Sequence, residues 1–399
     1  MSEWREARLG EVCSRLRSGT NITAKDIHEV GEVPVFGGNG IRGYTSEPNF
    51  SGECAIIGRQ GAYCGNVRYF NGAARMSEHA VVAVADAGNN TRFLAYLLST
   101  MNLGRLSGQA AQPGLSVKIL AQEPVLMPPL DLQARVASFV GSIDDLIENK
   151  RRRVEVLEEM ARAIYREWFV KFRYPGHGDV PLVDSALGPI PEGWVAGKVG
   201  QLCLRVQAGA TPRRSTPEYW AEPSVDWYKT GDLTDGVLIG SSEKLSNAGL
   251  KAGRTFEPET ILMAIYGSPT VGRLGLLTSL ASANQAALGL VANPEVSTTE
   301  HLWFTLEILR EHLNQIAQGA AQQNVSKEKV IGCDAIIPPR EVLEDFTRRA
   351  APSWRLSHEL ARQAVVLESL RDHLLPKLVT GEIDVSALNL DALLAEQVA

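Results

Sequence analysis

The residue types best suited to catalysis in this 399-residue chain do not form a complete catalytic site. Residues 38–43 fit the spacing GxGxxG, but residues 44–48 (YTSEP) follow in place of the helix start that a dinucleotide pyrophosphate needs. Acidic side chains at residues 144–148 precede Lys150, as in some metal-dependent nucleases. They lie on a predicted helix, where a solvated face explains them more simply. Neither a phosphate-binding GxxxxGK(S/T) motif nor a metal-binding HExxH motif is present.

Polar side chains flanked by glycine instead gather in loops at matching places in the two halves of the chain. Arg, Lys, Asn, Gln, Ser and Thr are the residue types that contact base edges and phosphates, and glycine lets a backbone approach a partner closely. Any one of these loops is explained well as an ordinary polar turn, but their recurrence favours binding. In the first half the candidate nucleic-acid contacts are Ser18, Thr20, Asn39, Arg42, Tyr44, Arg59, Gln60, Tyr63, Gln112 and Ser116. In the second half they are Thr211, Arg213, Arg214, Lys229, Thr230, Tyr266, Ser268, Thr270, Asn284, Gln285, Gln323, Asn324 and Lys327.

An internal repeat must position these loops. Trp4, Gly10 and Cys13 recur 190 residues later, and Pro128-Pro129 recurs 210 residues later. Ordered matches across about half the chain indicate a duplicated unit, each copy a globular part followed by a helix. Short apolar runs between glycine-rich turns predict strands in both copies, and helices are expected over residues 91–100 and 299–317.

After each Pro-Pro pair the pattern predicts a long helix. The first has an apolar seam at Val136, Val140, Ile143, Ile147, Val154, Leu157, Ala161, Ile164 and Trp168, interrupted by Lys150. The second has Leu356, Leu360, Leu367, Leu370 and Leu374, with Gln363 in the gap, and Pro376 is expected to end it. We expect the two helices to pack on each other as an antiparallel spacer. The alternative is that each packs on its own domain.

Composition restricts the remaining classes. A net charge of −6 taken alone disfavours a nucleic-acid binder, whose usual footprint is basic, although local patches matter more than the total. Five cysteines without a CxxC pair argue against a disulfide framework or a zinc ribbon, and Cys13 and Cys203 are expected to be small buried hydrophobes. No apolar run reaches the ~20 residues of a membrane helix, and the start is polar, so a cytoplasmic location without membrane contact is expected.

With these motifs in view, the chain resembles the specificity subunit of type I restriction–modification enzymes over essentially its whole length. The most specific segments are REWFVKFRYPGH at residues 166–177, LGPIPEGW at residues 187–194 and LLPKLVTGEIDV at residues 374–385. The segments VPVFGGNGIRGYT, IIGRQGAYCGNVRYF, YKTGDL and AIYGSPTVGRLG are similar to loops of target-recognition domains.

The resemblance implies an α+β fold with a pseudo-two-fold internal repeat, in which a pair of long antiparallel coiled-coil helices separates two globular target-recognition domains. Each domain would read one half of a bipartite DNA site. The expected segments are a first recognition domain at 1–130, a first spacer helix at 131–173, a linker at 174–190, a second recognition domain at 191–340, a second spacer helix at 341–376 and a C-terminal tail at 377–399.

The resemblance also implies partners that carry the chemistry. These are double-stranded DNA, two copies of an adenine methyltransferase subunit that uses S-adenosylmethionine, and a restriction subunit that uses ATP and Mg²⁺. The chain itself would bind no cofactor or metal and would not be an enzyme, because residues 127–130 and 337–340 lack the acidic or amide residue and the aromatic of the methyltransferase motif.

Tyr165, Trp168 and Phe169 are the candidate contacts with a partner subunit. The second helix lacks an equivalent of these three and carries Pro352 where the first has Ser142, so the two partner contacts are expected to differ. Two functions of other classes stay open at this point. They are a coiled-coil scaffold with two ligand-binding domains, and a solitary nuclease.

Overall fold

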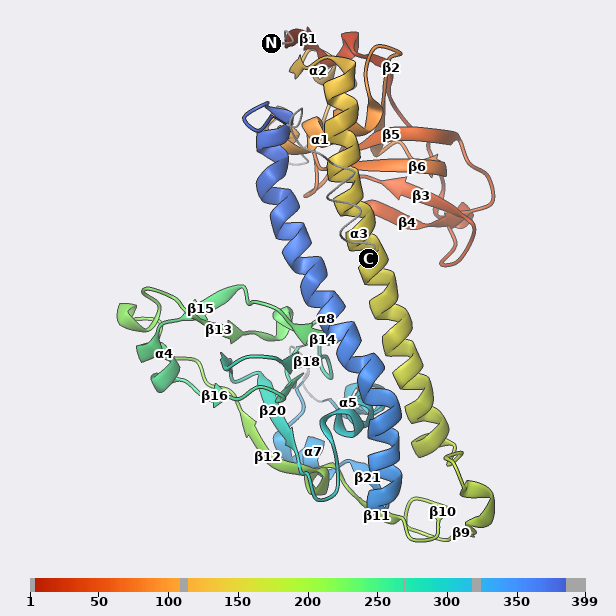
Figure 1. The fold of residues 1–399 in the computed structure, drawn as a ribbon, viewed down its shortest axis with the longest axis vertical. Coiled ribbons are helices and arrows are strands. Elements are labelled where there is room, and N and C mark those ends of the chain that lie inside the picture. The colour runs from red at the N-terminus through yellow and green to blue at the C-terminus, as the bar shows by residue number, and fades with distance from the viewer. Residues whose placement is uncertain (1–3, 108–113, 268–269, 318–323, 385–399) are drawn as a thin grey trace. The chain divides into compact units, whose positions relative to one another are not determined.

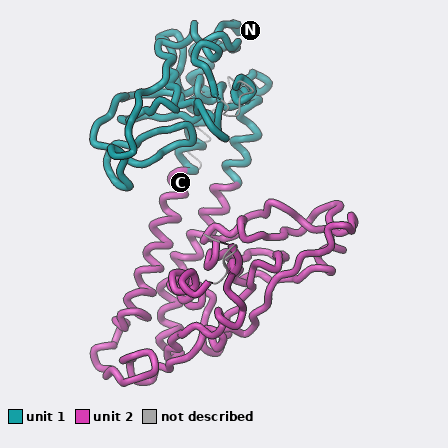
Figure 2. The backbone as a smooth tube through the Cα atoms, turned by 180° about the vertical axis from the view of Figure 1, so that it is seen from behind, with its two compact units in different colours: residues 1–147, 366–399 teal, residues 148–365 magenta. Residues whose placement is uncertain are grey.

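The computed structural model describes residues 4–107, 114–267, 270–317 and 324–384 (Figure 1). Contacts divide the chain into two compact units (Figure 2). Unit 1 comprises residues 1–147 and 366–399, and unit 2 comprises residues 148–365. Two long helices, α3 (Leu130–Tyr165) and α8 (Arg340–Val379), each contribute one part to unit 1 and the other part to unit 2.

Unit 1 is built on one mixed sheet with both faces covered. Its strand order is β2 (Cys13–Ser18), β7 (Ala80–Ala85), β5 (Phe50–Gly58), β6 (Val67–Met76), β3 (Val33–Gly37) and β4 (Gly40–Thr45). Side chains of β5 alternate between the two faces, as the two-residue period of a strand requires. Ala55 and Ile57 join the cluster under helix α1 (Thr91–Thr100), whereas Cys54 and Ile56 join a second cluster with Phe36.

Unit 2 holds two larger sheets. One has the order β12 (Cys203–Ala208), β20 (Ala287–Ala292), β17 (Ile261–Ala264), β18 (Leu274–Leu277) and β14 (Gly236–Leu238). The other has the order β15 (Glu243–Leu245), β13 (Val225–Tyr228), β19 (Ala281–Ala283) and β16 (Thr255–Phe256). The shorter elements of this unit are the strand pair β9 (Leu182–Val183) and β10 (Ile190–Pro191), and the helices α4 (Asn247–Ala252), α5 (Thr299–Ile308), α6 (Arg310–Ile316) and α7 (Lys327–Gly332).

The predicted duplication is confirmed in the strand register. In unit 1, β1 (Arg5–Arg8) pairs antiparallel with β8 (Pro124–Met127), followed along the chain by α3. In unit 2, β11 (Val195–Lys198) pairs in the same way with β21 (Asp334–Ile337), which precedes α8. In each copy a short helix, α2 (Val117–Leu120) or α7, directly precedes the second strand of the pair along the chain. The irregularity in β2 between Cys13 and Arg15 recurs in β12 between Cys203 and Arg205, so even a local distortion is repeated.

The predicted helix over residues 91–100 is confirmed as α1, but the other helix ends need correction. The single helix predicted over 299–317 is in fact two helices, α5 and α6, because the helix is interrupted at Leu309. The first long helix leaves the α-helical pattern after Tyr165 and continues as a π-helical turn over Arg166–Val170. Pro376 does not end the second helix, which continues to Val379.

Tertiary packing explains why α8 continues through Pro376. A proline inside a helix removes one hydrogen bond and costs about 3 kcal/mol. Here the turn that follows it carries Leu378 and Val379, which are 2% and 1% exposed in the core of unit 1. Burial of two aliphatic side chains is worth about 1.5–3 kcal/mol each, which offsets the cost. The Pro376 carbonyl also accepts a hydrogen bond from the backbone N–H of Thr380 at 3.2 Å.

The antiparallel pairing of the two long helices is confirmed within each unit. In unit 1 the guanidinium of Arg371 binds Asp144 at 2.8 Å, and in unit 2 Lys150 Nζ donates to Gln363 Oε1 at 2.6 Å. Lys150 and Gln363, the two polar interruptions of the predicted seams, therefore meet each other.

The predicted seam of α8 is wrong at two positions. Leu356 and Leu370 are 42% and 46% exposed, whereas Ser357 and Ala364 are buried. The buried face of each long helix is set by packing on the globular parts as well as by helix pairing, so the buried residues of α8 also include Phe346 and Trp354 in the core of unit 2. Likewise, Val136 and Val140 of α3 join the core of unit 1. Among the residues that the structure describes, no helix has the length and apolar character needed to cross a membrane.

Candidate functional site

In unit 1 the predicted loops converge at one end of the sheet. The turns that hold them together carry six backbone hydrogen bonds, of which five join segments far apart in the sequence and one, from Ala80 to Ser77, closes a local turn. These are Gly19 N–H to Ala80 O at 2.9 Å, Thr20 N–H to Met76 O at 3.0 Å, Ala80 N–H to Ser77 O at 3.0 Å, Ser77 N–H to Phe36 O at 2.9 Å, Arg59 N–H to His79 O at 2.9 Å and Leu115 N–H to Arg59 O at 2.8 Å. We call this set the loop frame of unit 1.

Unit 2 contains the same frame, bond for bond. The matching hydrogen bonds are Gly209 N–H to Ala287 O at 2.9 Å, Ala210 N–H to Ala283 O at 2.8 Å, Ala287 N–H to Asn284 O at 3.1 Å, Asn284 N–H to Tyr228 O at 2.9 Å, Ile265 N–H to Ala286 O at 2.9 Å and Val325 N–H to Ile265 O at 2.9 Å. An isolated bridge completes each frame, between Gln60 and Gly114 in unit 1 and between Tyr266 and Asn324 in unit 2. The repeat therefore extends to the polar loops.

Glycine is required where the first strand of each frame meets the opposite turn. A Cβ atom on Gly19 would lie 2.0 Å from the carbonyl oxygen of Met76. A Cβ atom on Gly209 would lie 2.2 Å from the carbonyl oxygen of Asn284. Both distances are far below van der Waals contact with backbone atoms that cannot move aside, so no other residue fits these two positions.

The side chains on the two frames differ. The position of Arg59 in unit 1 is held by Ile265 in unit 2, and the position of His79 is held by Ala286. Arg59 donates from Nε to the Leu115 carbonyl at 3.2 Å and from Nη1 to the Glu78 carbonyl at 3.4 Å. Its guanidinium is therefore partly used to hold the frame. Glu78 and His79, paired at 3.1 Å, were not predicted as site residues. The sequence analysis missed these two residues because they lie between two predicted loops and belong to no recognisable motif.

Most of the predicted contact residues are accessible to a ligand. The exposed ones are Thr20, Asn39, Arg42, Gln60, Tyr63, Thr211, Arg213, Arg214 and Gln285. The half-buried ones are Ser18, Tyr44, Arg59, Ser116, Lys229, Thr230, Tyr266, Thr270, Asn284, Asn324 and Lys327. Gln112, Ser268 and Gln323 lie outside the described residues. Tyr44 is not at the frame, because it pairs with Pro34 and His28 at the far end of β4.

Unit 2 also holds an arginine that contacts two tryptophan rings, which themselves meet edge to face with centroids 5.3 Å apart. The guanidinium carbon of Arg214 lies 3.8 Å from the ring centroid of Trp220 and 4.9 Å from that of Trp227. Arg214 forms an ion pair with Glu243, which also binds Lys229 Nζ at 2.8 Å. Hydrogen bonds from Arg214 and Lys229 lower the pKa of Glu243 to about 2, so the carboxylate is charged throughout the neutral range.

This arrangement, which we call the arginine box, fixes a cation at the rim of a surface hollow of about 740 Å³. The sequence analysis predicted Arg214 and Lys229 but missed Trp220, Trp227 and Glu243. The signal available was the interleaving of basic and aromatic residues in RRSTPEYW and DWYK. Cation–π stacking of this kind is worth about 0.5–2 kcal/mol and limits the rotamers of the arginine.

The expectation for Tyr165, Trp168 and Phe169 needs correction. The three side chains are only 5–7% exposed and belong to the core of unit 2, so they offer no surface to a partner subunit. Trp168 and Phe169 both pack on Phe346, and the Tyr165 hydroxyl is 2.9 Å from Thr305 Oγ1.

The repeat offset of 210 shows that these aromatics do have counterparts in the second helix. The matching positions are Leu375, Leu378 and Val379, which pack in the core of unit 1. The end of each long helix thus completes the core of one unit, with aromatic side chains in unit 2 and aliphatic ones in unit 1.

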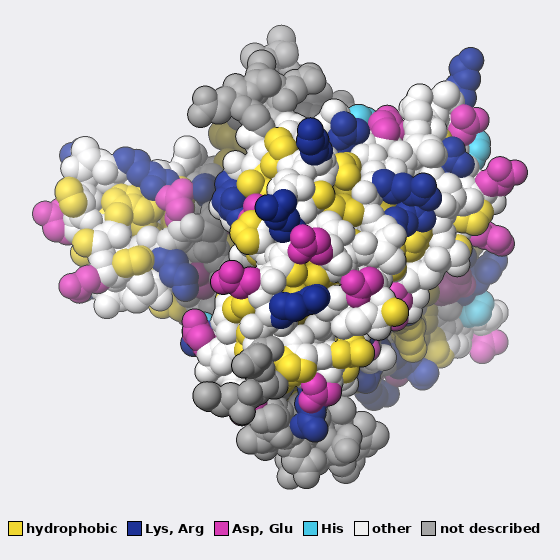
Figure 3. Space-filling model, turned by 90° about the horizontal axis from the view of Figure 1, so that it is seen from above, with side chains coloured by type: hydrophobic (Ala, Val, Ile, Leu, Met, Phe, Trp, Pro, Cys, Tyr) yellow, Lys and Arg dark blue, Asp and Glu magenta, His cyan; other side chains and the backbone are white. Residues whose placement is uncertain are grey.

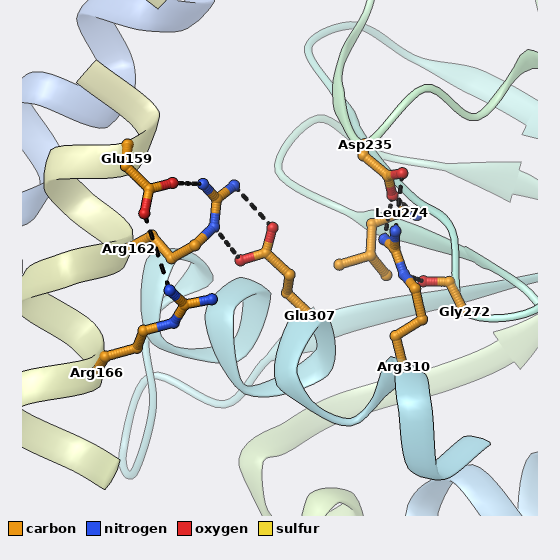
Figure 4. A network of polar contacts seen from close by, with 8 residues as sticks. All are labelled: Glu159, Arg162, Arg166, Asp235, Gly272, Leu274, Glu307 and Arg310. Atoms are coloured by element: carbon orange, nitrogen blue, oxygen red, sulfur yellow. Dashed lines mark hydrogen bonds and ion pairs between the residues drawn. The ribbon is translucent and has the colours of Figure 1, made fainter. Parts of the chain in front are cut away.

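Ion pairs fasten the end of α3 to the globular part of unit 2 (Figure 4). Arg162 donates to Glu307 from Nε and Nη2, both at 2.9 Å, and also pairs with Glu159. Beyond Glu307, Arg310 forms an ion pair with Asp235 and donates to the Gly272 carbonyl at 3.0 Å. Burial raises the pKa of the nearby Glu158 to about 7, with further upward shifts from Glu307 and other acids.

The cysteines fit the expectation of small hydrophobic residues. Cys13 and Cys203 are half-buried, and burial raises the pKa of both thiols to about 12. Within the described ranges, no three His, Cys, Asp or Glu side chains lie close enough together to hold a metal ion.

Comparison with known proteins gives consistent matches. Residues 1–159 match the family model described as the type I restriction modification DNA specificity domain. The chain is 39% identical over 148 residues to the type I restriction enzyme EcoprrI specificity subunit of Escherichia coli, a match that covers 36% of this chain and 37% of that protein. It is 26% identical over 310 residues to the MjaIX specificity subunit of Methanocaldococcus jannaschii, covering 75% of this chain and 70% of that protein.

Among solved structures, the S subunit of a type I restriction–modification system from M. genitalium superposes with a TM-score of 0.64. The superposition covers 94% of this chain and 96% of that chain. At 14% sequence identity the likeness concerns the fold alone.

Proposed function

We propose that the chain is a specificity subunit of a type I restriction–modification system, as its matches indicate, and that it selects the DNA sequence for a methylation and restriction complex. Each unit reads one half of a bipartite site in double-stranded DNA. The chain supplies sequence choice, and partner subunits supply the chemistry.

The observation that carries the proposal is the pair of loop frames. Six backbone hydrogen bonds recur at matching positions, while the side chains that the frames present differ. Two frames with matching backbone hydrogen bonds but different side chains are suited to two half-sites of different sequence. Within a major groove, every base pair has its own pattern of donors and acceptors, so replacing side chains on a fixed frame changes the sequence that is read.

The residues available for reading fit this task. Thr20, Asn39 and Gln60 are exposed amide and hydroxyl groups beside the frame of unit 1. In unit 2 the arginine box holds Arg214 in a restricted orientation while its side chain stays 53% exposed, and an arginine fits the O6 and N7 atoms of guanine. Lys and Arg side chains elsewhere hold phosphates and set the register on the duplex.

The charge of the chain favours a model in which partner subunits provide much of the contact with DNA phosphates. The net charge is −6, and on the face shown in Figure 3 basic side chains are interspersed with acidic ones. Phosphate neutralisation supplies most of the non-specific affinity of DNA-binding proteins. We therefore propose that the methyltransferase subunits, in two copies, provide much of the phosphate contact as well as the S-adenosylmethionine site. A restriction subunit using ATP and Mg²⁺ completes the assembly, which acts in the cytoplasm.

Co-expression with the candidate methyltransferase subunit tests the proposal. The two proteins are expected to co-purify, and the complex is expected to methylate adenine within a discontinuous sequence, mapped by sequencing the modified DNA. Cleavage by the purified chain alone with Mg²⁺ would instead indicate a nuclease. Co-purification without methylation or DNA binding would indicate a scaffold.

An exchange of one domain tests the assignment of one half-site to each unit. Replacing residues 191–338 with the matching segment of a homologue is expected to change one half-site and leave the other intact. A change in both half-sites would contradict the two-reader model.

A further inference from the structure

The two units contain one ion pair at the same place with its charges exchanged. Arg92 is the second residue of α1 and Glu300 is the second residue of α5. Asp145 is the sixteenth residue of α3, and Arg355 is the sixteenth residue of α8. In unit 1 the globular helix carries the base and the long helix the acid, whereas in unit 2 the assignment is reversed.

We propose that these two ion pairs form a charge code that determines which recognition domain each long helix accepts. The α3 position accepts a domain with a base at the second residue of its first helix. The α8 position accepts a domain with an acid there. The partner to which the code applies is therefore any recognition domain of this family that is exchanged into the chain.

The pair in unit 1 is part of a polar contact between α1 and α3. Arg92 Nη2 lies 3.1 Å from Asp145 Oδ1 and 3.2 Å from the Gly141 carbonyl oxygen. The Arg92 side chain is 24% exposed, and its guanidinium carbon also lies 4.9 Å from the Tyr69 ring centroid. One turn along α1, the Tyr96 hydroxyl donates to Asp144 at 2.5 Å.

The pair in unit 2 sits in an apolar contact between α5 and α8. Arg355 binds Glu300 Oε1 from Nη2 at 3.1 Å and from Nε at 3.3 Å. The Glu300 side chain is only 2% exposed, whereas Arg355 is 66% exposed. One turn along α5, Phe304 packs on Trp354 with ring centroids 6.2 Å apart. Phe304 and Trp354 occupy the positions of Tyr96 and Asp144 in unit 1.

A mismatched domain meets two unfavourable contacts at once. A base at the position of Glu300 faces Arg355, and an acid at the position of Arg92 faces Asp145. Like charges repel more strongly the less solvent screens them, and Glu300 is buried while Arg92 is half-buried. The neighbouring positions reinforce the choice, because a phenylalanine in place of Tyr96 leaves Asp144 without its hydroxyl donor.

The test reverses the charge of the exposed residue in each ion pair, because a substitution at an exposed position introduces no steric clash. Arg355→Asp and Asp145→Arg are each made in the full-length chain, and thermal unfolding is followed by calorimetry. Arg355→Asp leaves the buried Glu300 facing an acid, and a midpoint lowered by on the order of 10 °C is expected. Asp145→Arg is expected to lower the midpoint by a few degrees, because Asp145 is more exposed.

Relief within a unit distinguishes a code from a general loss of stability. Glu300→Gln is expected to recover at least half of the loss caused by Arg355→Asp, and Arg92→Gln is expected to do the same for Asp145→Arg. Combinations across units, such as Glu300→Gln with Asp145→Arg, are expected to give no recovery. The matched control is Glu344→Arg, which alters an exposed pair with Arg340 on the same helix and should shift the midpoint by no more than about 2 °C.

Domain acceptance is then measured directly. Residues 191–338 are replaced by a homologous domain with a base at the position of Glu300, in the wild-type chain and in the Arg355→Asp chain. Soluble full-length chain is expected at a severalfold higher yield on the Arg355→Asp background. Equal yields on both backgrounds, or equal recovery within and across units, would overturn the proposal.

Discussion

Gly19 lies so close to Met76 that a Cβ atom at residue 19 would stand 2.0 Å from the Met76 carbonyl oxygen, and a Cβ atom at Gly209 would stand 2.3 Å from the carbonyl oxygen of Ala283, the residue that matches Met76. Gly209→Ala is therefore expected to push β12 away from the turn and to lower the free energy of unfolding by about 1–3 kcal/mol. Urea unfolding measures this. Gly231→Ala, where nothing lies within 4 Å of the added atom, is the control and should leave the unfolding free energy unchanged within about 0.5 kcal/mol.

The arginine box predicts a specific effect on DNA binding. Arg214→Lys keeps the charge but loses the stacking on Trp220 and the guanidinium fork, so roughly tenfold weaker binding to the target duplex is expected. Fluorescence anisotropy of the complex with the methyltransferase subunit measures the affinity. Arg340→Lys, on an exposed intrahelical pair, is the control. If both variants bound equally well, Arg214 would not be a reading residue.

Glu158 predicts how the stability of unit 2 depends on pH. Its folded pKa is raised to about 7, so the folded state binds this proton more tightly than the unfolded state does. The contribution to stability is therefore greatest below about pH 4.5 and is lost as the pH rises through 7. Glu158→Gln is expected to stabilise the protein by up to about 3 kcal/mol at pH 8 and to change little at pH 5. Urea unfolding measures the free energy of unfolding of the wild-type and Glu158→Gln chains at both pH values. An equal difference between the two chains at pH 5 and pH 8 would contradict the prediction.

Substitutions at Trp168 and Val170 distinguish a structural role of this helix end in the core of unit 2 from a role in contact with a partner subunit. Trp168 is 7% exposed and packs on Phe346, so Trp168→Ala is expected to lower the free energy of unfolding by about 3–5 kcal/mol. Val170, on the same turn, is 51% exposed, and Val170→Ala should leave stability nearly unchanged. Loss of methyltransferase binding by Trp168→Ala without loss of stability would restore the contact role that the sequence predicted.

The sequence predicted the architecture well because the repeat is recorded in residues that fix the backbone. Pro128-Pro129 and its copy mark where a strand ends and a long helix begins. Strands β1 and β8 pair in the same register as β11 and β21, which lie 190 and 210 residues further along the chain. The register of α8 was not predictable from heptads. Leu356 and Leu370 satisfy a coiled-coil pattern but are exposed. For Leu356 the reason is that contacts with the globular part of unit 2 place Trp354 and Ser357 inside instead.

The candidate site was predictable as loops but not as side-chain contacts. Polar, glycine-flanked segments mark where the chain turns at the end of a sheet, so Thr20 and Arg59 were found. Glu243 was missed because it joins Arg214 only through the pairing of β15 with β13, which no local pattern records. Trp168 was misassigned because an aromatic cluster at a helix end has the same composition whether it fills a core or contacts a partner.

The discontinuity of unit 1 fixes an order of folding during synthesis. Unit 2 is complete once residue 365 has been made, whereas unit 1 needs Leu378 and Val379 to fill its core. At about 5–20 residues per second, residues 148–365 take roughly 10–40 s to synthesise. Throughout that interval Phe93, Leu94 and their neighbours lack their last packing partners. The N-terminal domain is thus the first to be synthesised and the last to receive its complete core.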